Sequence, residues 1–102
     1  MSKRVKIEKS SGNVFADLGF PPEEAANLTL RALIMMKLED WYAASGFTQA
    51  RAAKELGVTQ PRLNDLLKRR IDKFSLDALV NMAARTGMRV EMRVKAPLRK
   101  AA

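Results

Sequence analysis

TQARAAKELGVTQPRLNDL, residues 48–66, predicts two short helices that cross at a steep angle around a tight turn. Thr48 and Thr59 each precede one of these helices, and threonine is a favourable N-cap because its hydroxyl accepts a hydrogen bond from the first turn. Gly57 lies between the helices, where the backbone needs a left-handed conformation. Small or apolar residues fill the inward positions that close packing requires: Ala52, Ala53, Leu56, Val58, Leu63 and Leu66.

A longer helical pattern precedes this pair. An apolar patch at residues 14–20 leads to Pro22, which suits the first turn of a helix. Helical periodicity then runs to about Ala44, and Gly46 is expected to end the helix. Weak helix propensity at residues 27–29 leaves open whether this segment forms one helix or two.

The chain after the pair predicts one more helix. The second helix of the pair is expected to stop near Arg70, and Ser75 is a good N-cap for a helix that runs to about Arg85 and ends at Gly87. Several large side chains of the flanking helices are expected in the core rather than in a ligand site, with contact to a partner protein as the alternative for some of them: Met35, Met36, Trp41, Tyr42 and Met82.

Residues 88–95 change the apolar period from about 3.6 to 2, which predicts a half-buried strand with alternating faces. Because a lone strand leaves its backbone groups unpaired, it needs residues 1–13, the same strand of a second copy, or another protein. A second copy is the economical choice, so we expect a homodimer. Apolar residues form the expected dimer or partner face of this strand: Met88, Val90, Met92 and Val94.

The expected fold is therefore mainly α, a compact bundle of about five helices followed by one C-terminal β-strand. With 102 residues, the chain has the length of one domain. We expect a flexible basic segment at 1–13, the folded domain at 14–95 and a basic tail at 96–102. Val5 and Ile7 alternate with charged residues, so the first segment could alternatively form a short strand.

Charge predicts a polyanionic partner. The formal net charge is +8, and it is segregated, because residues 13–47 are net acidic while residues 48–73 and 85–102 are net basic. Clustered lysine and arginine side chains gain affinity for nucleic acid by releasing counterions from its phosphates. The expected partner is double-stranded DNA.

Composition also argues against other classes of protein. The sequence contains no cysteine and no histidine, which excludes disulfides, thiolate metal sites and histidine-dependent catalysis. It has no glycine-rich phosphate loop and no nucleophile paired with a base, so we expect neither an enzyme nor a cofactor. No apolar run reaches about 18 residues, and no apolar region follows the basic N-terminus, so we expect no membrane span, no secretory signal and a cytoplasmic protein.

Residues 48–63 resemble the helix-turn-helix of the lambda-repressor-like, or XRE, family, and the resemblance extends over about residues 30–87. Residues 13–19, NVFADLG, the helix start at Pro22 and the strand after the last helix are similar to small bacterial XRE proteins. Many of those are antitoxins of the HigA type, paired with RelE- or HigB-like ribonuclease toxins. The resemblance implies a sequence-specific transcriptional regulator, expected to be a repressor, or alternatively an antitoxin that neutralises a small toxin and autoregulates its operon.

The outward face of the second helix of the pair predicts the DNA-reading residues. Its N-terminal end comes closest to base edges in this motif, where glutamine and asparagine can bind adenine and arginine can bind guanine. We expect base contacts from Gln60, Pro61, Arg62, Asn64 and Asp65. A merely solvated polar face is the alternative, and Asp65 could instead orient Arg62 or Arg69.

Other residues are expected to contact the DNA backbone, which sets register and affinity rather than sequence. By resemblance, Gln49 contacts a phosphate and braces Gln60. The expected backbone contacts are Thr48, Gln49, Thr59, Lys68, Arg69 and Arg70, with Arg51 and Lys54 as weaker candidates. A homodimer would place two reading helices about one DNA turn apart, which implies a palindromic operator.

Overall fold

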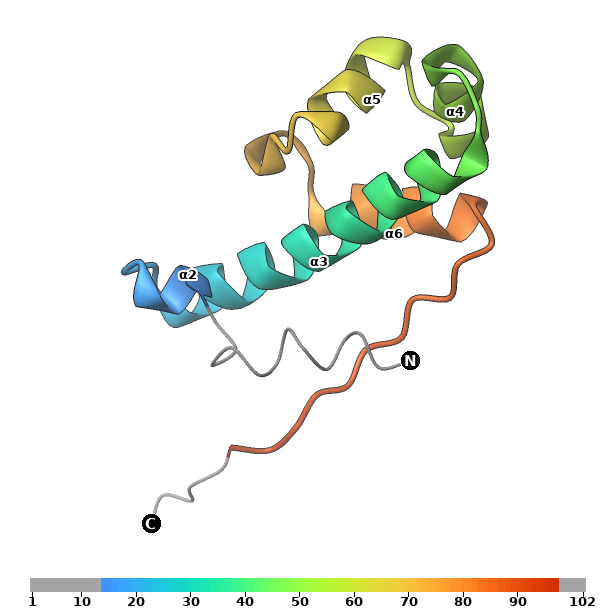
Figure 1. The fold of residues 1–102 in the computed structure, drawn as a ribbon. Coiled ribbons are helices and arrows are strands. Elements are labelled where there is room, and N and C mark those ends of the chain that lie inside the picture. Colours follow the sequence, from blue (N-terminus) through green and yellow to red (C-terminus); the bar gives the residue numbers. More distant parts are fainter. Residues whose placement is uncertain (1–13, 98–102) are drawn as a thin grey trace.

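The computed structural model describes residues 14–97, so the predicted segment 1–13 and most of the predicted tail 96–102 lie outside the described residues. The described part contains five α-helices and one 3-10 turn, which confirms the prediction of a mainly α fold (Figure 1). In chain order the elements are α2 (Val14–Asp17), α3 (Pro22–Ser45), α4 (Gln49–Leu56), α5 (Gln60–Leu67), η1 (Ile71–Lys73) and α6 (Leu76–Arg85).

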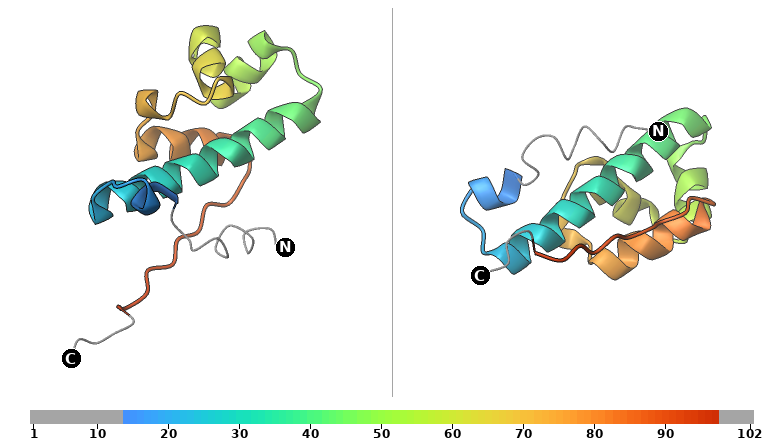
Figure 2. Two further views of the ribbon diagram at one scale, coloured as in Figure 1. Left: turned by 60° about the vertical axis from the view of Figure 1, so that its left-hand side comes forward. Right: turned by 90° about the horizontal axis from the view of Figure 1, so that it is seen from below.

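The longest element, α3, is one continuous helix of 24 residues. Pro22 occupies its first turn, and Gly46 ends it with φ of 76°. Leu28 is buried within the stretch of weak propensity, so tertiary packing outweighs the local preference there. α2 packs against α3, α6 lies alongside it, and α4 and α5 lie together on one side of both (Figures 1 and 2).

The core lies where α3, α4, α5 and α6 meet. Met35 and Met82 are buried there as predicted, and Trp41 and Tyr42 are partly buried against the same cluster. The prediction for Met36 is wrong, because this side chain is 50% exposed on the face of α3 that turns away from the cluster. Six large side chains are fully buried: Leu38, Leu56, Leu63, Leu66, Phe74 and Leu79.

The helix starts follow the predicted N-caps. The hydroxyls of Thr48, Thr59 and Ser75 accept backbone hydrogen bonds at 3.1, 3.2 and 3.1 Å from the third residue after each. α5, however, ends at Leu67 and not near Arg70. Arg69 adopts φ of 58°, a left-handed conformation that cannot continue a right-handed helix, and η1 follows it.

The predicted C-terminal strand is not formed. Residues 88–97 are extended and run back toward the α2 end of the molecule while diverging from α3 (Figures 1 and 2), and they make no ladder with any other described segment. Met88 packs against the core, whereas Val90, Met92 and Val94 are 43, 66 and 84% exposed. A strand requires a second backbone to pair with, and the described neighbours of this segment are helical, so their backbone groups are already paired.

Candidate nucleic-acid interface

The turn between α4 and α5 is built around Gly57. Its φ of 76° is the left-handed conformation that the sequence predicts, and the Val58 N–H donates to the Ala53 carbonyl at 3.0 Å across the turn. Arg85 of α6 lies directly over the glycine, so a Cβ there would sit 2.7 Å from Arg85 Nε. The same Nε donates to the Glu55 carbonyl at 3.1 Å, which ties the end of α4 to α6.

α5 turns its apolar face to the core and its polar face outward. Leu63 and Leu66 are fully buried, and the small side chains Ala52 and Ala53 of α4 are buried with them in the same cluster. The opposite face carries the predicted base-reading residues. Gln60 and Pro61 are exposed, and Asn64 and Asp65 are half-buried on the same helix.

Arg62 is placed differently from the other predicted base-reading residues. Its guanidinium carbon lies 4.4 Å from the centre of the Phe74 ring, a cation–π contact. One of its terminal nitrogens, Nη1, donates to the Lys73 carbonyl at 2.9 Å. In this conformation the guanidinium lies on the segment that follows α5, so a base contact requires the side chain to change rotamer.

A second arginine, from α3, holds the same segment. Nη1 of Arg31, on α3, donates to the carbonyls of Ile71 and Phe74 at 3.1 and 3.0 Å. Its Nε donates to Asn27 Oδ1 at 2.7 Å, which fixes the direction of the side chain. Sequence reasoning missed this contact, because the partners are about forty positions apart and no local pattern marks them.

Comparison with protein families identifies the motif. A family model described as a helix-turn-helix domain matches residues 14–95, which is most of the chain. The chain belongs to this helix-turn-helix family. The comparison with curated proteins found no match. A helix-turn-helix domain binds DNA with its second helix in the major groove, and in this chain the second helix is α5.

The cations beyond the helix-turn-helix lie on its surface. Arg69 Nε is 3.1 Å from Glu39 Oε2, and Arg70 Nη1 is 3.7 Å from Asp65 Oδ1. The side chains of Arg69 and Arg70 are 78 and 49% exposed, and surface ion pairs contribute only about 0–1 kcal/mol, so phosphates can compete with the carboxylates for these arginines. Lys68 is exposed, and within residues 14–97 its ammonium has no ion-pair partner.

The remaining backbone candidates lie on α4 and at the N-caps of α4 and α5. Thr48 and Thr59 accept hydrogen bonds as N-caps, and each hydroxyl keeps its own hydrogen to donate to a phosphate. Arg51 pairs with Glu55 at 2.9 Å and stacks on the ring of Phe47, and Lys54 is exposed. Gln49 is half-buried, and no hydrogen bond in the described part of the chain joins its side chain to Gln60.

Metal sites and membrane spans are both absent from the described residues. No group of three or more aspartate, glutamate, histidine or cysteine side chains is placed to hold a metal ion among residues 14–97. Over the same residues, none of the helices is both long and apolar enough to cross a membrane.

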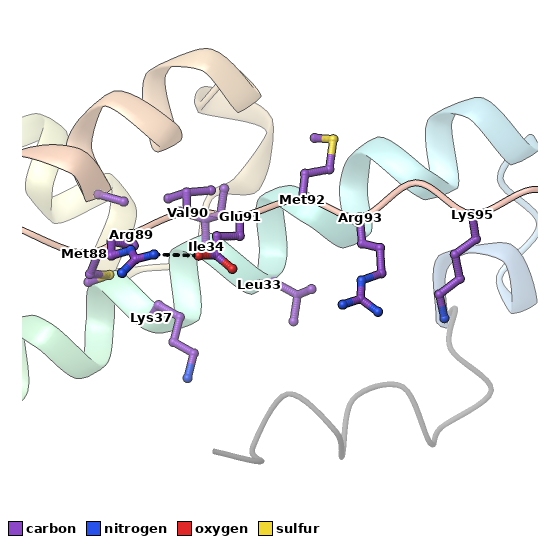
Figure 3. Close-up of a pocket in the computed structure, with 11 residues that line it drawn as sticks. Leu33, Ile34, Lys37, Met88, Arg89, Val90, Glu91, Met92, Arg93 and Lys95 are labelled. Atoms are coloured by element: carbon purple, nitrogen blue, oxygen red, sulfur yellow. Dashed lines mark hydrogen bonds and ion pairs between the residues drawn. The ribbon is translucent and has the colours of Figure 1, made fainter.

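A groove separates α3 from residues 88–95 on another face of the molecule. It has a volume of about 870 Å³, and Leu33 and Ile34 of α3 line one wall. Figure 3 shows the Arg89–Glu91 ion pair, formed at 3.0 Å, on the other wall. The four predicted partner-strand residues therefore do not all share one environment, because Met88, Val90 and Met92 line the groove and Val94 does not.

Proposed function

We propose that the protein is a sequence-specific transcriptional repressor of the lambda-repressor-like class that reads the DNA major groove as a homodimer. The observation that carries this proposal is the exposed N-terminal half of α5, held outward by the glycine turn and by its buried leucines. The basic residues that flank α5 support it, because they can neutralise phosphates on both sides of a groove. The proposal includes no catalytic role and no cofactor.

The residues at the start of α5 would read the bases. α5 has eight residues and so spans about 12 Å, which lets only its first turns reach base edges. Gln60 and Asn64 can each bind an adenine through two hydrogen bonds, and Pro61 can contact a thymine methyl group. Asp65 can accept from a cytosine amino group. In the structure it pairs with Arg70 and not with Arg62 or Arg69, the two arginines that the sequence suggested.

Residues around α5 would hold the DNA backbone. Lys68, Arg69 and Arg70 follow the recognition helix directly and are all exposed. These contacts would set the position of the duplex and supply the salt-dependent part of the affinity. The hydroxyls and amide at the two helix starts would add contacts of the same kind, from Thr48, Gln49 and Thr59.

The homodimer would form through residues 88–95. Their exposed apolar side chains and unpaired extended backbone favour addition of a second strand. Charge permits antiparallel self-pairing: with Met92 on the two-fold axis, Glu91 of each copy faces Arg93 of the other, and cross-strand pairs of opposite charge are favourable. Such a dimer would set the two α5 helices about 34 Å apart on a palindromic site.

Selection of duplexes from a random pool tests this proposal. We expect an inverted repeat with half-sites about one helical turn apart. On the selected site, Gln60→Ala should cost about 1–3 kcal/mol of binding free energy and relax the preference at one position in each half-site. Lys68→Ala is the matched control: it should weaken binding equally on all duplexes and reduce the salt slope by about 1.

Two results would contradict the proposal. The first is no binding to any duplex at low salt. The second is binding without sequence preference, with Gln60→Ala and Lys68→Ala behaving alike.

A second candidate function is that of an antitoxin that neutralises a RelE- or HigB-like toxin and represses its own operon. The groove between α3 and residues 88–95 favours it, because its exposed apolar residues suit a protein partner. Co-expression with a small ribonuclease-like protein encoded beside its gene tests this role. Relief of growth arrest together with a stable complex in size-exclusion chromatography supports it, and continued growth arrest without a complex rejects it.

A further inference from the structure

We propose that Phe74 and the Lys73 carbonyl form a holding site for the guanidinium of Arg62. In this proposal the side chain leaves the holding site only for a base that offers two acceptors, so Arg62 adds to the binding free energy only on duplexes that present guanine to it. The inference rests on the DNA-reading function proposed above. It adds a position for the Arg62 side chain in the free protein and a change of that position on DNA binding.

The holding site is complete without DNA. It provides a ring face at 4.4 Å and a carbonyl acceptor at 2.9 Å, and the Phe74 ring is almost fully covered, with 1% of the residue exposed. The Phe74 carbonyl is itself fixed by Arg31 at 3.0 Å, so the ring has a defined position before Arg62 reaches it. Arg62 therefore leaves a preformed site and not bulk water.

Arg62 is also free to leave without a large electrostatic penalty. Its polar partner is a neutral carbonyl, and no carboxylate in the described part of the chain pairs with it. The backbone N–H of Arg62 remains bound to the Thr59 hydroxyl in the first turn of α5, so the side chain starts from the end of the helix nearest the bases. A change of rotamer, without movement of the helix, is enough to transfer the guanidinium.

Only guanine can compensate Arg62 for the ring contact and the hydrogen bond that it loses on leaving the holding site. Leaving Phe74 removes a cation–π contact and a hydrogen bond and uncovers an aromatic face. Guanine offers O6 and N7 as two adjacent acceptors that match the guanidinium, whereas adenine and thymine each offer one acceptor and cytosine presents a donor. A base with fewer acceptors cannot compensate for the loss, and Arg62 stays on Phe74.

The rotamer change can be followed directly by NMR on the full chain. In the free protein the shielding of the Phe74 ring should shift the side-chain Nε–H and Cδ–H signals of Arg62 upfield. On the selected duplex this shift should disappear. On the same duplex with 7-deazaguanine at the base opposite Arg62, which lacks the N7 acceptor, the shift should persist. An Arg62 signal that stays shielded on the selected duplex would overturn the proposal.

A substitution of the ring tests the cost of leaving the holding site. Phe74→Leu keeps an apolar side chain but removes the ring face, so Arg62 no longer loses this contact when it binds guanine. Binding to the duplex with guanine at that position should tighten about threefold to tenfold, and binding to the other three duplexes should tighten less. Discrimination at the position read by Gln60 should not change.

Phe47→Leu is the matched control, because Phe47 lies under Arg51 in the same kind of contact at 4.5 Å but outside α5. Unchanged affinity of Phe74→Leu for the guanine duplex, with the fold intact, would overturn the proposal. If Phe74→Leu does not fold, the NMR measurement on the unaltered chain decides. Failure of the unaltered chain to select any sequence would instead refute the DNA-reading function, so the two failures are distinguishable.

Discussion

At Gly57 two separate requirements act on one residue. The turn needs φ of 76°, and Arg85 occupies the space that a side chain would take. Gly46 provides a natural comparison, since it has the same φ of 76° but no atom within 4 Å of the point where a Cβ would lie. Comparison of the two glycines therefore separates the cost of left-handed backbone strain from the cost of the clash with Arg85.

We predict that Gly57→Ala destabilises the protein more than Gly46→Ala. Left-handed strain should cost about 1–2 kcal/mol at both positions. At Gly57 the Arg85 side chain must also swing away and lose its hydrogen bond to the Glu55 carbonyl, which adds about 1 kcal/mol. Urea denaturation measures both variants. In an Arg85→Ala background the two costs should become equal, and a persistent difference would show that Arg85 is not the cause.

The two requirements differ in how well the sequence reveals them. The left-handed conformation of Gly57 is predictable, because the turn motif is local and glycine is its marker. The approach of Arg85 is not predictable, because it depends on how α6 crosses the end of α4. The same reasoning applies to Arg62, whose exposed polar position in the helical pattern is visible in the sequence while its contact with Phe74 is not.

Among the elements, η1 depends most on contacts from other parts of the chain. It is a single 3-10 turn between α5 and α6, and its carbonyl groups are held by arginines of α3 and α5. Short 3-10 turns have little stability of their own. The position of the C-terminal end of α5 therefore depends on these side chains.

We predict that Arg31→Met destabilises the protein by about 1–3 kcal/mol, because two part-buried carbonyls lose their charged donor while the aliphatic packing is kept. Arg51→Met is the control, since Arg51 makes only surface contacts, an ion pair with Glu55 and a stack on the Phe47 ring, and its loss should cost about 1 kcal/mol or less. Thermal or urea denaturation compares the two. Equal costs would contradict a structural role for the Arg31 contacts.

The end of α5 gives a second prediction at this scale. Arg69→Gly should be more stable than Arg69→Ala by about 1 kcal/mol, because only glycine adopts φ of 58° without strain. Both variants lose the ion pair with Glu39, so the difference between their free energies of unfolding measures the backbone strain at position 69. At Lys68, where φ is −92°, the order should reverse and alanine should be the more stable. The same order at both positions would contradict a left-handed Arg69.

Element boundaries were predictable where a cap marks them. Thr48, Thr59 and Ser75 start their helices and Gly46 ends α3, because each signal lies within one turn of the boundary it sets. The end of α5 was misplaced, since arginine carries no local signal for a left-handed conformation. The strand prediction failed for another reason. The alternation of apolar and charged residues at 88–95 concerns one segment, whereas a β-ladder needs a second strand that pairs with it.

At the scale of the whole molecule, the proposed DNA-binding surface and the groove occupy different places. The exposed cations that follow α5 lie beside the recognition helix, whereas the groove lies between α3 and residues 88–95. This separation allows the proposed dimer interface to be altered without changing any residue proposed to contact DNA.

We predict that the double variant Val90→Lys, Met92→Lys is a monomer at concentrations where the unaltered chain is a dimer. Four added charges across one dimer interface repel, and the exposed apolar contact is lost. Sedimentation equilibrium measures the mass, and operator affinity should fall at least about tenfold, or 1.4 kcal/mol. Met36→Lys, on an equally exposed residue outside the groove, should change neither. A double variant that remains dimeric would place the interface elsewhere.

The continuous α3 has a practical consequence for experiments on this protein. At about 1.5 Å per residue its 24 residues span about 36 Å, and α2 packs at the end remote from the helix-turn-helix turn (Figure 1). The sequence contains no cysteine, so Asp17→Cys would introduce a unique thiol on exposed α2. A fluorophore attached there would lie far from bound DNA, and its anisotropy would report complex formation without a label on the duplex.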